Sequence, residues 1–96
     1  MYILDSMVKK TAVVKNSAGI HVRPSGEIFK EVETYPGKVE ITSNGMTMPL
    51  DNVMVLLAMG LVKGSEVTIS VDGPDEEKAC SRFVELFEKE YDFPPR

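Results

Sequence analysis

One stretch decides both the fold and the chemistry of this chain, and it reads Asn16-Ser17-Ala18-Gly19-Ile20-His21-Val22-Arg23-Pro24-Ser25-Gly26. An alternating, strand-like run over residues 9–15 leads into it, and a helix-like run over residues 22–34 leaves it. His21, the only histidine of the chain, therefore lies at or just before a helix N-terminus. Unpaired backbone N–H groups and the positive end of the helix dipole meet there. This position favours a side chain that handles an anion.

An imidazole at this position is suited to accept a phosphoryl group and to hold it as phosphohistidine. A ring nitrogen of His21 would be the nucleophile. The guanidinium of Arg23, two residues on, and the amides of the first helical turn would neutralise the added charge. The alternative is a histidine that only caps the helix or lies in a surface loop.

The residues around His21 each have a physical role in this reading. Gly19 allows a tight turn or a positive φ before the histidine. Pro24 is tolerated in the first helical turn, where its missing N–H would have lacked a partner anyway. Ser25 and Gly26 are small, which predicts that the backbone beside the site stays open to a partner.

The composition limits the class of protein. The chain has 96 residues, of which 43% are hydrophobic, and this predicts one domain with a small core. A net charge of −4 argues against a nucleic-acid-binding protein. No apolar run approaches the roughly 20 residues of a membrane helix, and residues 1–7 are too short and too acidic for a signal peptide. A single cysteine, Cys80, and a single histidine predict no internal disulfide, no metal site and a reducing, cytoplasmic setting.

Hydrophobic periodicity predicts strands over residues 9–15, 38–43, 46–50 and 66–71, helices over residues 22–34 and 53–59, and a last helix that opens at Gly73-Pro74. Asn44-Gly45 predicts a type I′ hairpin turn, and Pro49 predicts that its strand lies at a sheet edge. The order β-α-β-β-α-β-α predicts an α+β, two-layer sandwich. The side chains expected in the core are Ala12, Val14, Ile28, Phe29, Val32, Tyr35, Val39, Ile41, Leu56, Met59, Val67, Ile69, Val71, Ala79, Phe83, Leu86 and Phe87.

The short helix expected over residues 53–59 is apolar nearly all round. Leu56 and Met59 would face the core, which leaves a second stripe formed by Val53, Met54 and Leu57. An exposed apolar stripe usually marks a docking surface, although ordinary core packing is the competing interpretation.

Four stretches carry a family resemblance: Gly19-Ile20-His21-Val22-Arg23-Pro24, Ser43-Asn44-Gly45-Met46-Thr47, residues 59–70 and residues 73–79. Their order and spacing resemble HPr, the histidine phosphocarrier family of the bacterial phosphotransferase system. The first of them matches the signature G-[IL]-H-x-R-P. The resemblance covers about residues 7–91, which would form the carrier domain. Residues 1–6 would be an N-terminal extension and residues 92–96 a C-terminal tail.

The resemblance implies an open-faced sandwich with a four-stranded antiparallel sheet of order 1-4-2-3 and three helices on one face. It also implies that His21 accepts phosphate on Nδ1 from enzyme I, charged by phosphoenolpyruvate, and passes it to an enzyme IIA domain. Such a protein is a carrier in sugar transport rather than a stand-alone enzyme, needs no cofactor and can also bind regulatory proteins. A carrier with one small docking face is expected to be a monomer.

The same resemblance assigns roles to individual residues. Arg23 would stabilise the phosphate charge, while Gly19, Val22 and Pro24 would shape the phosphate site. Lys30 and the stripe of residues 53, 54 and 57 would dock the partners.

Two departures from the family pattern leave alternatives open. Asn52 stands where many relatives carry a regulatory serine, and it cannot be phosphorylated. Asp51 and Val55 stand where some relatives are basic. Asn52-Val53, Leu56-Leu57 and Gly73-Pro74 with the acidic residues 75–77 also resemble NPr, the carrier of the nitrogen-related phosphotransferase branch, and the sequence does not separate the two branches. A non-transferring HPr-like binding module is the third reading, although such modules lack the histidine and keep the serine.

Overall fold

The computed structural model describes residues 7–91, so the expected extension over residues 1–6 and the tail over residues 92–96 lie outside the described residues. The described chain runs through seven helices and strands in the predicted order. They are β1 Val8–Val13, α1 Val22–Val32, β2 Lys38–Ser43, β3 Met46–Pro49, α2 Val53–Ala58, β4 Glu66–Asp72 and α3 Glu76–Glu88.

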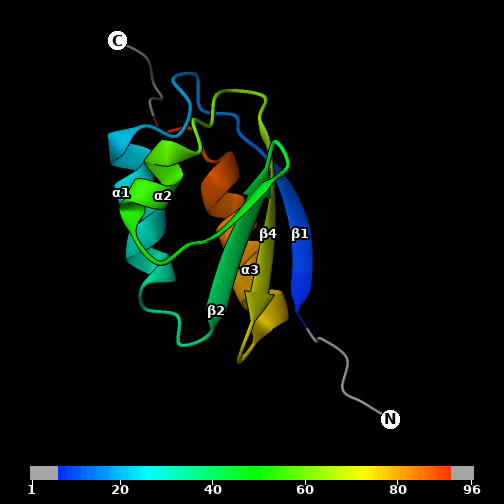
Figure 1. Ribbon diagram of the computed structural model, residues 1–96. Helices are drawn as coiled ribbons and strands as arrows, with labels where there is room; N and C mark the ends of the chain where they lie inside the picture. Colours follow the sequence, from blue (N-terminus) through cyan, green and yellow to red (C-terminus); the bar gives the residue numbers. More distant parts are fainter. Residues whose placement is uncertain (1–6, 92–96) are drawn as a thin grey trace.

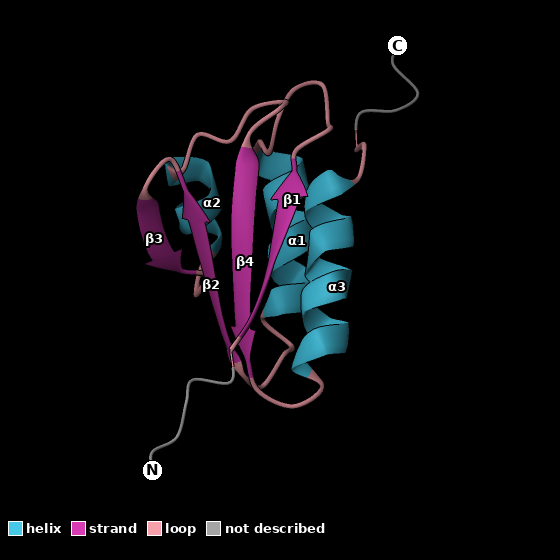
Figure 2. Ribbon diagram, turned by 90° about the vertical axis from the view of Figure 1, so that its right-hand side faces the viewer, coloured by secondary structure: helices cyan, strands magenta, loops and turns pink. Residues whose placement is uncertain are grey.

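The four strands form one antiparallel sheet of order β1-β4-β2-β3. All three helices cover one face of this sheet (Figures 1 and 2), which confirms the expected open-faced sandwich. The other face is polar and carries a row of threonines that crosses all four strands in register. Its members are Thr11, Thr68, Thr42 and Thr47, with hydroxyl pairs at 3.3 Å between Thr11 and Thr68 and 2.8 Å between Thr42 and Thr47.

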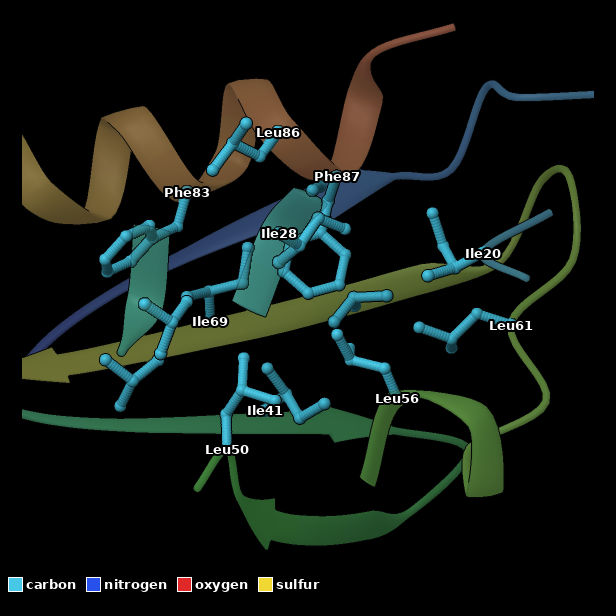
Figure 3. Packing of buried hydrophobic residues seen from close by; sticks show 14 of the residues in the cluster. Ile20, Ile28, Ile41, Leu50, Leu56, Leu61, Ile69, Phe83, Leu86 and Phe87 are labelled. Atoms are coloured by element: carbon cyan, nitrogen blue, oxygen red, sulfur yellow. The ribbon is translucent and has the colours of Figure 1, made fainter. Parts of the chain in front are cut away.

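The core lies between the sheet and the helices, and Figure 3 shows side chains of both layers packed against one another. Val67, Ile69 and Val71, the inward residues of β4, are fully buried, as their alternation predicts. Of the side chains expected in the core, Phe29, Tyr35 and Ala79 lie at its margin and are only partly buried.

Cys80 is part of the same core. It is fully buried on α3, and its thiol donates a hydrogen bond to the Ile69 carbonyl at 3.3 Å. Burial raises the pKa of this thiol, so it stays protonated at neutral pH. The prediction of a packed rather than a reactive cysteine is consistent with both features.

Several element ends differ from the prediction. β1 ends at Val13 rather than at residue 15, because the N–H and carbonyl of Val14 pair instead with Ser65 and Gly64 in a loop. α1 ends at Val32 rather than at residue 34, where the chain tightens into a turn. α3 begins only at Glu76, because Asp75 takes a left-handed φ of 49° that no helix tolerates.

The β2–β3 hairpin follows the prediction closely. Asn44 and Gly45 both have positive φ, at 53° and 77°, as a type I′ turn requires. β3 lies at the edge of the sheet and ends at Pro49, where a missing N–H costs no ladder hydrogen bond.

Candidate functional site

Three segments meet at one end of the molecule: the loop of residues 14–21, the loop of residues 59–65 and the C-terminal end of α3 (Figure 1). His21 is the last residue of the first loop and the N-cap of α1. The site is therefore held from three directions, although its signature residues lie within one short stretch of sequence.

Gly19 and Ile20 attach the histidine loop to the loop of residues 59–65. The Ile20 N–H donates a hydrogen bond of 3.0 Å to the Leu61 carbonyl. Gly19 has a φ of 74°, and a Cβ atom at this residue would lie 2.4 Å from the Leu61 oxygen and 3.0 Å from the Val62 Cα. Only glycine fits such an approach, so the predicted positive φ is confirmed and has a steric reason.

His21 occupies the N-cap without using its side chain as a cap. Its backbone is extended, with φ −90° and ψ −162°, and its side chain makes no capping hydrogen bond. Its carbonyl accepts the first helical hydrogen bond, from Ser25 N–H at 2.9 Å. The residue is half-buried, and its side chain does not make the hydrogen bond that the helix-cap alternative requires. The imidazole lies where the helix dipole favours an anion.

Pro24 and Ser25 turn inward beneath the site. Pro24 is fully buried in the first turn, and the fully buried Ser25 hydroxyl donates to the Ile20 carbonyl at 3.3 Å. The expectation that Ser25 keeps the backbone open is wrong, because this side chain instead ties α1 to the loop. Gly26 does face open space, with no atom within 4 Å of a Cβ placed there.

Arg23 is exposed on the first turn, and its guanidinium contacts the far end of the chain. Nη2 donates a hydrogen bond of 2.6 Å to the Tyr91 carbonyl, just beyond α3. Val22, between His21 and Arg23, has 71% of its surface exposed. A partner can therefore reach Val22 and Arg23, the two residues that follow the histidine.

Sequence reasoning missed Asn16 and Tyr91. The pattern around Asn16 indicated a turn, yet its side chain is completely buried. Its Nδ2 donates to the Gly19 carbonyl at 2.8 Å, and its Oδ1 accepts from the Tyr91 N–H at 2.7 Å. The two residues lie 75 positions apart, and no periodicity relates them.

Tyr91 is anchored through its ring as well as its backbone. Its hydroxyl donates to the Leu86 carbonyl at 2.7 Å, and the Lys89 ammonium lies 5.2 Å from the ring centre. Burial, with a smaller effect of Glu27, raises the pKa of Tyr91 to about 12.

This raised pKa predicts an alkaline loss of stability. Below pH 10 the folded and unfolded forms both keep the Tyr91 proton; between about pH 10 and pH 12 only the unfolded form loses it. The free energy of unfolding should therefore fall as the pH rises through this window. In urea titrations at about pH 9, Tyr91→Phe should be about 1 kcal/mol less stable than the wild type. Between about pH 9 and about pH 11, the free energy of unfolding of Tyr91→Phe should fall by less than that of the wild type. Equal losses in both proteins would show that Tyr91 does not carry the effect.

The helix expected to dock partners lies beside α1 (Figure 1). Met54 is 63% exposed, whereas Val53 and Leu57 are half-buried. Val55 lies in the core, with 6% exposure. Asn52 caps α2, because its side-chain oxygen accepts a hydrogen bond of 2.8 Å from Met54 N–H.

Sequence reasoning also missed Val62 as a surface residue. It is 62% exposed and adjoins Gly19. Its apolar neighbours along the chain gave no signal that this one side chain points outward.

Within residues 7–91, no helix is long and apolar enough to cross a membrane. Over the same described range, no three histidine, cysteine, aspartate or glutamate side chains gather as metal ligands.

The fold and the site together define a class: a small α+β domain that presents a single histidine at the N-terminus of its first helix. The family model described as "PTS HPr component phosphorylation site" matches residues 8–89. The chain therefore belongs to the HPr family, the phosphocarriers of the phosphotransferase system.

Individual relatives agree with this assignment. Phosphocarrier protein HPr of Borreliella burgdorferi is 35% identical over 82 residues, which cover 85% of this chain and 95% of that protein. Its counterpart in Vibrio cholerae is 32% identical over 83 residues, which cover 86% and 98%. The solved histidine-containing phosphocarrier protein of Mycoplasma matches with a TM-score of 0.74 and 28% identity, over 82% of this chain and 90% of that one. HPr of Bacillus anthracis shares the fold, with a TM-score of 0.81 and 24% identity over 86% and 99% of the two chains.

Proposed function

We propose that His21 accepts a phosphoryl group from enzyme I, charged by phosphoenolpyruvate, and passes it to an enzyme IIA domain of a sugar phosphotransferase system in the cytoplasm. The observation that carries this proposal is the position of a half-buried histidine at the N-terminus of α1, where the first-turn amides and the Arg23 guanidinium can neutralise an anion. Membership of the phosphocarrier family supports it. The protein would act as a monomeric carrier between two active sites, without a cofactor of its own.

The transfer needs little from the carrier beyond position and charge. The lone pair of His21 Nδ1 attacks phosphorus in line, a P–N bond forms, and the bond from phosphorus to enzyme I breaks with its electron pair staying on enzyme I. In the second step the enzyme IIA nucleophile attacks phosphorus, and the P–N bond breaks with its electron pair staying on His21 Nδ1. The amides of the first turn of α1 and the Arg23 guanidinium offset the charge of the bound group.

Val22, Gly19 and Pro24 would shape the site without taking part in the chemistry. Gly19 and Pro24 fix the backbone on either side of the histidine through the close contact with Leu61 and through burial. The exposed Val22 leaves the imidazole approachable. Each donor at an exposed helix end is worth about 0.3–1 kcal/mol, which suits a carrier that must release its phosphate.

The nitrogen-related branch is the second candidate, and the residue before α2 favours it. Asn52 uses its side-chain oxygen to cap α2 and has no hydroxyl to phosphorylate. Asp51 beside it is acidic rather than basic. Phosphorylation rates with purified enzyme I of each branch, taken from one organism, separate the candidates. Because the relatives named above are phosphocarriers called HPr, we expect kcat/KM to be higher with the sugar-branch enzyme; a higher value with the nitrogen-branch enzyme would assign the chain to that branch.

Partner docking would use the apolar surface beside His21. Val22 follows the histidine, Val62 adjoins Gly19, and the exposed Met54 lies on the helix next to α1. Val53 and Leu57 would add their exposed parts, and Lys30 would supply a cation from the last turn of α1. Exposed apolar side chains around a reactive group are typical of docking surfaces.

Met54→Glu should weaken docking without unfolding the protein. A carboxylate at the centre of an apolar contact loses its hydration on binding, so KM for phosphorylation by enzyme I should rise by about tenfold with kcat little changed. Met46→Glu is the matched control, because Met46 is also exposed, at 49%, but lies on the β2–β3 hairpin. An equal rise in KM for both variants would contradict the assignment of this surface.

A further inference from the structure

Asn16 is a buried polar residue that no step of the proposed transfer uses. Its side chain is completely enclosed, yet both its amide donor and its carbonyl acceptor are paired within the protein. Burying an amide is tolerated only when its hydrogen bonds are made. Asn16 therefore fastens the Gly19 carbonyl, in the histidine loop, to the Tyr91 N–H, at the end of the described chain.

The second partner of Asn16 leads directly to the site. The peptide N–H of Tyr91 binds Asn16 Oδ1 at 2.7 Å, while the carbonyl of the same residue accepts Arg23 Nη2 at 2.6 Å. The tyrosine hydroxyl, bound to the Leu86 carbonyl, holds the residue from a third side. The carbonyl that binds the guanidinium is thus fixed in place, and Asn16 is the side chain that fixes its backbone.

We propose that Asn16 is a positioning residue for phosphoryl transfer: it holds the Tyr91 carbonyl as a competing acceptor for the Arg23 guanidinium. This inference rests on the proposed function of His21. When His21 is phosphorylated, Arg23 gives up its bond to the carbonyl in order to bind the phosphoryl oxygens. Loss of this hydrogen bond reduces the net stabilisation of phosphohistidine by Arg23. The phosphoryl group is therefore transferred more easily to the next acceptor.

The proposal predicts the direction of a measurable shift. Without Asn16, the Tyr91 carbonyl is held less firmly and binds Arg23 more weakly. The guanidinium therefore gives up a weaker hydrogen bond when it turns to the phosphoryl group. Hydrogen bonds to charged groups are among the stronger ones in proteins. Asn16→Ala should therefore move the phosphoryl equilibrium with phosphoenolpyruvate toward the phosphorylated carrier by about threefold to tenfold.

The experiment measures this equilibrium by intact mass, with catalytic enzyme I and enough excess pyruvate to hold the wild type half phosphorylated. Asn16→Ala is compared in the wild-type background and in the Arg23→Ala background. The shift should disappear when Arg23 is absent, because the two residues act through one bond network. Ser43→Ala is the control for lost stability alone: Ser43 is also buried and binds a backbone carbonyl, that of Glu66, on the sheet.

The outcomes separate the inference from the function on which it rests. An unchanged equilibrium in Asn16→Ala, the same shift in both backgrounds, or the same shift in Ser43→Ala would overturn the positioning role. If Asn16→Ala does not fold, Tyr91→Pro, which lacks both the N–H donor and the hydroxyl, is compared with Tyr91→Phe, which lacks only the hydroxyl. The equilibrium of Tyr91→Pro should shift further in the same direction, and the difference should depend on Arg23 in the same way. A wild-type protein that takes no phosphate would refute the proposed function itself.

Discussion

His21→Ala should fold like the wild type and take up no phosphate at all. His21 is the only histidine, so no other imidazole can replace it as the acceptor. Its side chain lies only partly within the protein, and alanine keeps the carbonyl that accepts the Ser25 N–H. The free energy of unfolding should stay within about 1 kcal/mol of the wild type, as for most substitutions outside the core.

Two measurements on the same sample decide this prediction. Urea unfolding reports the fold, and intact mass after incubation with enzyme I and phosphoenolpyruvate reports phosphate uptake. Arg23→Ala is the informative comparison, since loss of charge stabilisation should slow phosphorylation without abolishing it. A His21→Ala protein that still gains a phosphoryl group would place the acceptor elsewhere; one that unfolds would make the histidine a structural residue.

Gly19→Ala should be among the most damaging single-methyl changes in the described chain. The new Cβ would lie 2.4 Å from the Leu61 carbonyl oxygen, in a backbone with φ 74° that alanine avoids. The backbone conformation alone costs about 1 kcal/mol, and the collision adds to it, so the total loss should reach about 3 kcal/mol or more. The loop must then move, and His21 moves with it.

Gly45→Ala is the matched control for Gly19→Ala. Gly45 has nearly the same φ, 77°, but a Cβ there meets no atom within 4 Å. Its loss of stability should be about 1 kcal/mol, and the phosphorylation rate should not change. Thermal unfolding and the rate with enzyme I measure both effects. Equal losses of stability in the two variants would show that the close approach to Leu61 does not contribute to the destabilisation.

Much of the fold follows from local signals in the sequence. Alternation placed Val67, Ile69 and Val71 on the core side of β4, and Asn44-Gly45 indicated the hairpin turn. The strand order did not follow from periodicity, because alternation orients side chains but does not say which strands are neighbours. It came from the resemblance, and the structure confirms it.

Like the fold, the site has one part that the local sequence predicts and another part that it does not. The histidine, the glycine turn and the helix start lie within six residues, so their relation is visible in the sequence. The bond from Arg23 to Tyr91 spans 68 positions, and the bond from Asn16 to Tyr91 spans 75. Such pairings depend on the packing of α3 across the sheet, which local patterns do not encode. Burial of Asn16 was missed for the related reason that asparagine also favours turns.

Intact mass shows whether His21 carries phosphate. The purified protein is incubated with phosphoenolpyruvate and enzyme I, and its mass is measured before and after brief acid treatment. We expect a gain of one phosphoryl group that acid removes, as for a P–N bond, and that His21→Ala does not show. No gain with enzyme I of either branch, or a gain that survives acid and persists in His21→Ala, would mean that His21 is not the phosphate carrier.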